Sequence, residues 1–148
     1  MAVQKKAVRK PAVKKPQPTW LTAVRAAEEK KAQDIKVLDL TDVSSFTDYF
    51  VICTGSSAKQ NQAISDEVAI RLKKNGELPL SVEGYTQAEW VLSDYGDLVV
   101  HALTPKARSY YDLERLWREA KPVEIPAEEP PPPAPAASKR RAVSAKSA

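Results

Sequence analysis

The chain has 148 residues, a formal net charge of +4 and one cysteine. This length fits one domain with tails, one cysteine provides no disulfide framework, and no apolar run reaches the roughly 18–20 residues of a membrane span. The lone thiol fits a reducing compartment, and the N-terminus carries no apolar signal segment, so we expect a cytoplasmic protein that does not bind membranes.

The basic charge is concentrated at the two ends. Residues 1–19 carry six basic and no acidic side chains, and residues 122–148 carry four basic and three acidic ones. Residues 20–121 hold thirteen basic and sixteen acidic side chains, which gives them a net charge of −3. An acidic domain suits a basic protein surface, whereas basic tails attract polyanions without reading their sequence.

Both ends have the composition of disordered tails. Residues 1–19 mix Lys, Ala and Val with three prolines, and residues 122–148 are rich in Pro, Ala, Lys and Arg, with one run of four prolines. Such segments have too few large apolar side chains to form a core. The first tail is either an electrostatic arm for RNA or a solubilising segment. The sequence thus predicts one domain, residues 20–121, between two tails.

The first half of this domain predicts two helices around two strands. Thr19 can cap a helix that begins at Trp20. Strands are predicted over residues 35–40 and 49–54, and the second is a near-continuous β-branched and aromatic run, typical of a strand buried on both faces. A helix follows over residues 58–74, because apolar side chains recur there every four residues after a serine cap.

The second half predicts three strands and a final helix. A short strand is expected over residues 78–83. Two more, residues 90–94 and 98–103, are joined by a tight turn with Tyr95-Gly96 as its central pair. The Thr104-Pro105 pair then begins a helix, since proline fits the first helical position. We therefore predict an α/β fold with a mixed five-stranded sheet flanked by helices.

The last helix is predicted to continue to Trp117. Tyr110, Leu113 and Trp117 follow at i, i+3 and i+7, with Leu116 beside them, which is the spacing of a core-facing helix side. We assign Leu113, Leu116 and Trp117 to the core. Tyr110 and Trp90 fit either the core or an interface.

One enzymatic alternative rests on Gly55-Ser56-Ser57, which follows a strand and precedes a helix. Backbone amides at a helix start bind phosphate, so a nucleotidyltransferase-type nucleotide-binding enzyme is the alternative function. The segment lacks the Gly-Lys-Ser/Thr of a P-loop and the spaced glycines of a dinucleotide site. Asp66 and Glu67 are adjacent on a helix and cannot form the alternating carboxylate pair that a two-metal site requires.

His101, the only histidine, shares one predicted hairpin with Ser93 and Asp94. A nucleophile needs a base that a third group holds close to it, and these regular strands lack a strained elbow for the serine. We interpret His101 as a strand histidine with an ordinary hydrogen bond. Too few ligands are present for zinc. No catalytic, cofactor-binding or metal-binding residue is predicted, and no cofactor is expected.

The hairpin and the last helix instead have the composition of a protein interface, with aromatic residues, an arginine and charges at the rim. The domain also carries a series of motifs in a fixed order. These are Asp48-Tyr49-Phe50-Val51-Ile52, Gly55-Ser56-Ser57, Val82-Glu83-Gly84, Trp90, Asp94-Tyr95-Gly96-Asp97, Val100-His101 and the run from Arg108 to Trp117. Together they closely resemble the Iojap-related ribosomal silencing factors over residues 20–121. Ala102 and Leu103 depart from the family, which tends to have larger apolar residues there.

The resemblance implies a nucleotidyltransferase-like fold without the catalytic carboxylates, and a protein that is not an enzyme. It implies binding to the large ribosomal subunit through ribosomal protein uL14, a block to subunit association, and lower translation under starvation or in stationary phase. It also implies a homodimer off the ribosome. The positions carried over as candidate partner contacts are Asp48, Glu83, Trp90, Asp94, Tyr95, His101, Arg108 and Tyr111.

Overall fold

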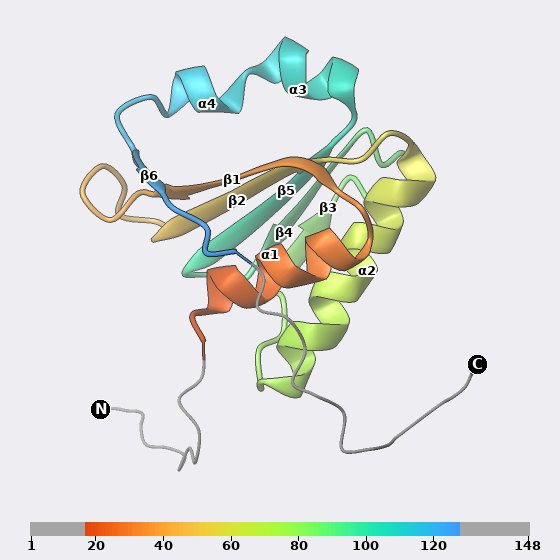
Figure 1. Cartoon of the computed structure of the whole chain (residues 1–148), viewed down its shortest axis with the longest axis horizontal. Coiled ribbons are helices and arrows are strands. Elements are labelled where there is room, and N and C mark those ends of the chain that lie inside the picture. Colours follow the sequence, from red (N-terminus) through yellow and green to blue (C-terminus); the bar gives the residue numbers. More distant parts are fainter. Residues whose placement is uncertain (1–16, 128–148) are drawn as a thin grey trace.

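The computed structural model describes residues 17–127, which form three layers with a sheet in the middle (Figure 1). Within these residues the sheet has six strands in the order β3-β4-β5-β2-β1-β6. The elements in chain order are α1 (Thr19–Glu29), β1 (Gln33–Asp39), β2 (Tyr49–Thr54), α2 (Ala58–Lys74), β3 (Ser81–Glu83), β4 (Trp90–Asp94), β5 (Leu98–Leu103), α3 (Pro105–Tyr111), α4 (Leu113–Leu116) and β6 (Lys121–Val123).

The sheet is mixed, as predicted. β2 and β5 pair in parallel at its centre, and every other pair of neighbouring strands is antiparallel. α1 and α2 cover one face, while α3 and α4 cross the other (Figure 1). Five of the six residues of β2 are buried, which confirms the interpretation of its apolar run as a strand covered on both faces.

The core has two parts, one on each side of the sheet. Side chains of α1 and α2, such as Val24, Ile64 and Val68, pack on Val51 and Val100. The other part is smaller and consists of Leu38, Leu40, Phe50, Ile52, Val99, Leu103, Ala107, Leu113 and Ala120. Because α3 and α4 together span few residues, they cover only part of their face. This leaves room for a functional surface.

The sequence predicted five strands, whereas the structure has a sixth, β6. It pairs antiparallel with residues 37–39 of β1, so the folded part continues past residue 121. Farther along, Arg25 donates a hydrogen bond of 2.9 Å to the carbonyl oxygen of Pro126. A three-residue strand has no periodic pattern to recognise, and Pro122 argues against one. The edge position explains its presence, since proline is tolerated there.

The prediction of one continuous last helix was also wrong. Asp112 adopts a left-handed conformation with φ of 49° and divides the segment into α3 and α4. The break turns α4, so the i, i+3, i+7 spacing no longer describes one face. Leu113 is buried as predicted, Trp117 is half-buried, and Leu116 is 69% exposed instead of lying in the core.

The predicted Thr19 cap was wrong, since α1 begins at Thr19 itself and its N-cap Pro18 makes no side-chain hydrogen bond. Other local predictions hold with small shifts. α2 begins and ends at the predicted residues, and its N-cap Ser57 accepts a hydrogen bond from the Gln60 amide. The strand predicted over 78–83 is shortened to Ser81–Glu83. Between residues 17 and 127, no helix combines the length and the apolar character needed to cross a bilayer. Most of both predicted tails lies outside the described residues.

Candidate functional site

The part of the sheet that α3 and α4 leave uncovered carries an aromatic and acidic surface. Side chains alternate along β4, so Trp90, Leu92 and Asp94 lie on one face and are half-buried. Glu83 of β3 is paired with Leu92. Tyr111, at the end of α3, lies against Trp90 with ring centroids 4.6 Å apart. We call these five residues the open face.

The side chain of Trp90 is held by a hydrogen bond to His101. Its indole Nε1 donates a 3.0 Å hydrogen bond to Nδ1 of His101, which is buried in the neighbouring strand β5. Burial lowers the pKa of His101 to about 3, so the ring is neutral and carries its proton on Nε2. That Nε2 is buried and has no hydrogen-bond partner among residues 17–127. The prediction of a strand histidine with an ordinary hydrogen bond is confirmed.

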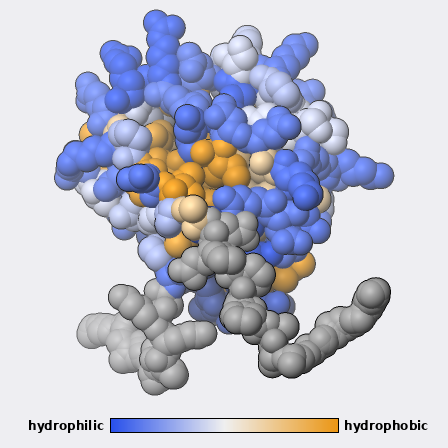
Figure 2. All heavy atoms as spheres, in the orientation of Figure 1, coloured by the Kyte–Doolittle hydropathy of each residue, from blue (hydrophilic) through white to orange (hydrophobic). Residues whose placement is uncertain are grey.

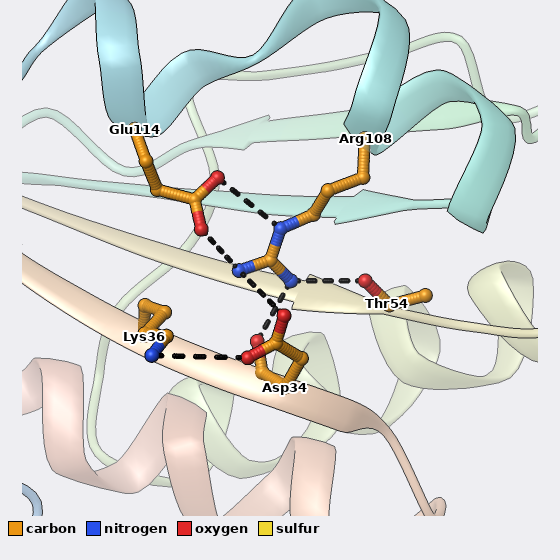
Figure 3. Close-up of polar contacts among 5 residues, drawn as sticks. All are labelled: Asp34, Lys36, Thr54, Arg108 and Glu114. Atoms are coloured by element: carbon orange, nitrogen blue, oxygen red, sulfur yellow. Dashed lines mark hydrogen bonds and ion pairs between the residues drawn. The ribbon is translucent and has the colours of Figure 1, made fainter.

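Arg108, one turn before Tyr111 on α3, anchors this helix (Figure 3). The Arg108 guanidinium donates to both carboxylate oxygens of Glu114, at 3.3 and 2.7 Å. Nη1 also donates to Thr54 Oγ1 at 2.9 Å and to the carbonyl oxygen of Asp34 at 2.7 Å. The Arg108 side chain is only 10% exposed. Arg108 therefore ties α3 to α4 and to two strands, and we call these four residues the Arg108 clamp.

The electrostatics of the clamp follow from this geometry. The hydrogen bonds from Arg108 lower the pKa of the Glu114 carboxyl below its ordinary value, because they favour its ionised form. Asp34 also approaches the guanidinium with its own carboxylate, at 3.6 Å, and contacts Lys36 at 3.8 Å. The positive charge of Arg108 is thus neutralised inside the molecule. The predicted role of Arg108 as a surface contact does not fit this position.

The loop that leads into β4 is held by α2. Asn61 is fully buried, and its amide Nδ2 donates to the carbonyl oxygen of Ala88 at 2.9 Å. Gln62 Nε2 donates to the carbonyl oxygen of Tyr85 at 2.8 Å. Ala88 has a positive φ of 56°, a conformation that costs energy for a residue with a Cβ and must be held by its surroundings. The start of β4 is therefore a fixed part of the structure.

The eight candidate contacts do not form one site. Glu83, Trp90, Asp94 and Tyr111 share the open face, with Trp90 and Asp94 at opposite ends of β4. Leu92 joins them and was missing from the candidates, although the alternation along β4 already placed it beside Trp90. Asp48 is exposed at the start of β2, next to the start of β5, whereas Trp90 is paired with the last residue of β5. Asp48 and Trp90 thus lie toward opposite ends of the sheet.

Tyr95 lies in the core because the hairpin turns one residue later than predicted. The Tyr95 amide donates to the carbonyl oxygen of Leu98, so the two turn residues are Gly96 and Asp97, with Gly96 at φ of 92°. Tyr95 belongs to the strand side of the turn, and its ring packs with the α1 and α2 core. Burial raises the pKa of its hydroxyl. Tyr95 and His101 thus shape the fold from inside.

Charge is distributed unevenly over the domain. No lysine or arginine lies between Lys74 and Lys106 in the sequence, and this interval contains β3, β4 and β5. Its acidic residues are Glu77, Glu83, Glu89, Asp94 and Asp97. Burial and the nearby Asp48 charge raise the pKa of the Asp97 carboxyl, which shows how closely acids gather at the hairpin end. The open face therefore belongs to an acidic half of the domain.

The glycine-serine segment at the start of α2 is engaged internally. The Ser56 amide donates to Gln60 Oε1 at 2.6 Å, and Gln60 Nε2 donates to the carbonyl oxygen of Lys30 at 2.9 Å. A Cβ on Gly55 would collide with the Asn61 side chain. A phosphate at this helix start would have to displace the Gln60 carboxamide from the Ser56 amide. This arrangement is that of a capped helix, which weakens the nucleotide-binding alternative.

Other chemistry is scarce in the described part of the chain. Among residues 17–127, no three His, Cys, Asp or Glu side chains gather as a metal site would require. Cys53 is buried, and burial raises the pKa of its thiol to about 12, so it is not a nucleophile in the folded protein. The open face can make contacts through its aromatic rings and carboxylates.

An apolar area also occupies the middle of the view in Figure 2, surrounded by hydrophilic residues. At the edge formed by β1 and β6, a shallow hollow of about 360 Å³ is lined mainly by apolar side chains, among them Ile35, Val123 and Ile125. The two charged side chains at its rim, Lys36 and Glu114, already contact Asp34 and Arg108. The hollow presents no free polar group that would orient a small ligand.

Comparisons with known proteins agree with this description. The family model "Ribosomal silencing factor during starvation" matches residues 13–148. The chain is 46% identical over 98 residues to ribosomal silencing factor RsfS of Bacillus subtilis, which covers 66% of this chain and 83% of the relative. It is 37% identical over 109 residues to the chloroplastic protein Iojap of Zea mays, which covers 72% of this chain and 46% of the relative.

Two solved structures share the fold. A crystal structure of a protein from Chromobacterium violaceum superposes with a TM-score of 0.66 at 38% identity, covering 68% of this chain and 83% of that chain. A crystal structure of a protein from Bacillus halodurans gives a TM-score of 0.64 at 42% identity, covering 72% of this chain and 96% of that chain. The predicted mixed sheet flanked by helices is thus confirmed, with six strands in place of five.

Proposed function

Because the chain belongs to the ribosomal silencing factor family, we propose that it binds the large ribosomal subunit through ribosomal protein uL14. By occupying that protein it blocks association with the small subunit and represses translation under nutrient limitation or in stationary phase. The observation that carries this proposal is the open face, where Trp90 is fixed by His101 and Tyr111 within an acidic half of the domain. The role requires contact and bulk, and no chemical step.

The open face has the properties of a protein contact. Trp90 and Tyr111 offer large apolar areas whose orientation is already set, so binding costs little side-chain entropy. Glu83 and Asp94 share this face, with Asp94 at the opposite end of β4 from Trp90, and Asp94 Oδ1 accepts from the Gly96 amide at 2.8 Å, which fixes its carboxylate. A protein that sits on ribosomal RNA must itself be basic. Carboxylates beside a rigid aromatic anchor provide complementary charge and speed the encounter.

The test is binding of the purified full-length chain to isolated large subunits, followed by pelleting or fluorescence anisotropy. Binding to large subunits and none to small subunits is expected. Trp90→Ala removes the central anchor, and a loss of about 2–3 kcal/mol, roughly 30- to 150-fold in Kd, follows from its position. Asp94→Arg reverses a charge on the same face and should weaken binding as well.

The matched control is Glu119→Arg, which reverses an exposed charge in the hollow beside Val43 and Leu116, away from the open face. It should bind like the parent. Circular dichroism of each variant establishes that it is folded. If folded Trp90→Ala and Asp94→Arg variants both bind large subunits with the affinity of the parent, the open face is not the contact surface. If the parent does not bind large subunits, the proposed function is wrong.

We further propose that the free protein is a cytoplasmic homodimer, and that the basic tails add weak contacts to ribosomal RNA. Sedimentation at several protein concentrations measures the first. The second predicts an affinity that falls with salt and a shallower salt dependence after removal of residues 1–16 and 128–148, because each lost cation–phosphate contact reduces the slope.

A further inference from the structure

β3 forms one edge of the sheet, and β4 is its only strand neighbour within the described residues. An edge strand presents unpaired backbone amides and carbonyls that can pair with another chain. Beside these groups, Leu78, Leu80 and Val82 are 64%, 73% and 41% exposed. Of these, Val82 lies on β3, while Leu78 and Leu80 lie in the segment that leads into it. Exposed apolar side chains beside an unpaired edge are a common feature of strand-addition sites.

The two sides of this edge differ in chemistry. Val82 is paired with Ser93, whose hydroxyl lies 3.4 Å from that of Ser65 on α2. Val82 therefore points to the α2 side of the sheet. Glu83 is paired with Leu92 and points to the opposite side, where it belongs to the open face. The edge is thus apolar on the α2 side and acidic on the side of the open face.

Charge argues against a second copy of the chain at this edge. Two copies of the chain could pair antiparallel along this segment, with Leu78 of each copy opposite Val82 of the other and Leu80 at the centre. The same register sets Glu77 opposite Glu83 twice, and like charges directly opposite each other destabilise a strand pair. No lysine or arginine between residues 75 and 105 compensates for them. A strand that carries Lys or Arg opposite Glu83 meets the opposite charge.

We propose that β3 takes an extended basic segment of the ribosomal protein partner as an additional strand of the sheet. In that segment basic residues alternate with apolar ones, because basic side chains face Glu83 while apolar ones lie beside Leu80 and Val82. The added strand continues the open face by one strand width, so one partner contacts both surfaces. This inference rests on the proposed function and specifies how the partner binds.

The test is hydrogen–deuterium exchange of the full-length protein, free and bound to purified large subunits. The amides of residues 80–83 that point away from β4 should exchange at least tenfold more slowly in the complex, because strand addition gives them hydrogen-bond acceptors. Val82→Lys places a cation on the edge and should weaken binding at least tenfold. Leu116→Lys, at a similarly exposed apolar position on α4, should leave binding unchanged.

Each outcome decides a separate question. If the protein binds large subunits and the β3 amides exchange as in the free protein, strand addition is refuted while the proposed function stands. Parent-like binding by folded Val82→Lys also refutes it. Protection of β3 in the free protein that grows with its concentration shows that a second copy covers the edge, against this inference. Absence of binding by the parent refutes the proposed function and this inference with it.

Discussion

Removal of Arg108 should disconnect α3 and α4 from the sheet, and the cost can be worked out from its contacts. Arg108→Gln loses two charge-assisted hydrogen bonds to Glu114 and one each to Thr54 and Asp34. The Arg108 side chain is 10% exposed, whereas those of Glu114 and Asp34 are 35% and 61% exposed, and losing these bonds implies a loss of about 3 kcal/mol. In a domain of this size that lowers the Tm by roughly 10–20 °C.

A double-mutant cycle isolates the pair. Urea unfolding followed by far-UV circular dichroism is measured for Arg108→Gln, Glu114→Gln and the combined variant. We expect a coupling free energy of about 1–2 kcal/mol, because the pair is bidentate but partly solvated. The control cycle is Arg71→Gln with Glu67→Gln, a single-bond i,i+4 pair at 2.8 Å on α2, for which about 0.5 kcal/mol is expected.

The result that refutes this reasoning is additivity. If the combined Arg108 and Glu114 variant loses the sum of the two single losses within about 0.5 kcal/mol, the clamp is not a coupled unit. The clamp also has a functional consequence. Below its Tm, Arg108→Gln should bind large subunits about tenfold more weakly, because Tyr111 is no longer held against Trp90.

Two further predictions concern buried titratable groups. The pKa of His101 is about 3 in the folded protein against an ordinary value of 6.5, so below pH 6.5 the unfolded chain binds a proton that the folded chain does not. The free energy of unfolding should therefore fall by about 2 kcal/mol from pH 7 to pH 5. Urea titrations at each pH measure this fall, and His101→Phe should remove most of it. An equal pH dependence in the variant would contradict the assignment to His101. Cys53 is buried with its pKa raised to about 12, so a thiol reagent at pH 8 should react only in step with global unfolding, and rapid reaction of the native protein would contradict the burial.

The elements that the sequence predicted well are those with strong local signals. α2 has a serine cap, a four-residue apolar repeat and an Asn-Gly end, and each of these acts within a few residues. β2 is a continuous β-branched run that only a doubly covered strand explains. In contrast, β6 exists because β1 offers it a free edge, and the break at Asp112 lets α3 and α4 bend over the sheet. Neither signal is local.

The candidate site was predicted in its composition but less well in its geometry. The acidic aromatic character of β4 is readable from the chain, and so is the shared face of Trp90 and Leu92. The burial of His101 and Arg108 could not be read from the sequence, for different reasons. Every residue of β5 is buried, so alternation carried no information about His101. A long cation is usually exposed, and the burial of Arg108 depends on Asp34 and Thr54, which are distant in sequence.

The most direct test of the proposed mechanism is subunit joining. Purified large and small subunits are mixed at a magnesium concentration that favours whole ribosomes, with increasing amounts of the full-length protein, and the products are separated on sucrose gradients. Saturating protein should keep the subunits apart and co-migrate with the large subunit, while folded Trp90→Ala should require at least tenfold more protein for the same effect. Undiminished formation of whole ribosomes at saturating protein would contradict the proposed mechanism.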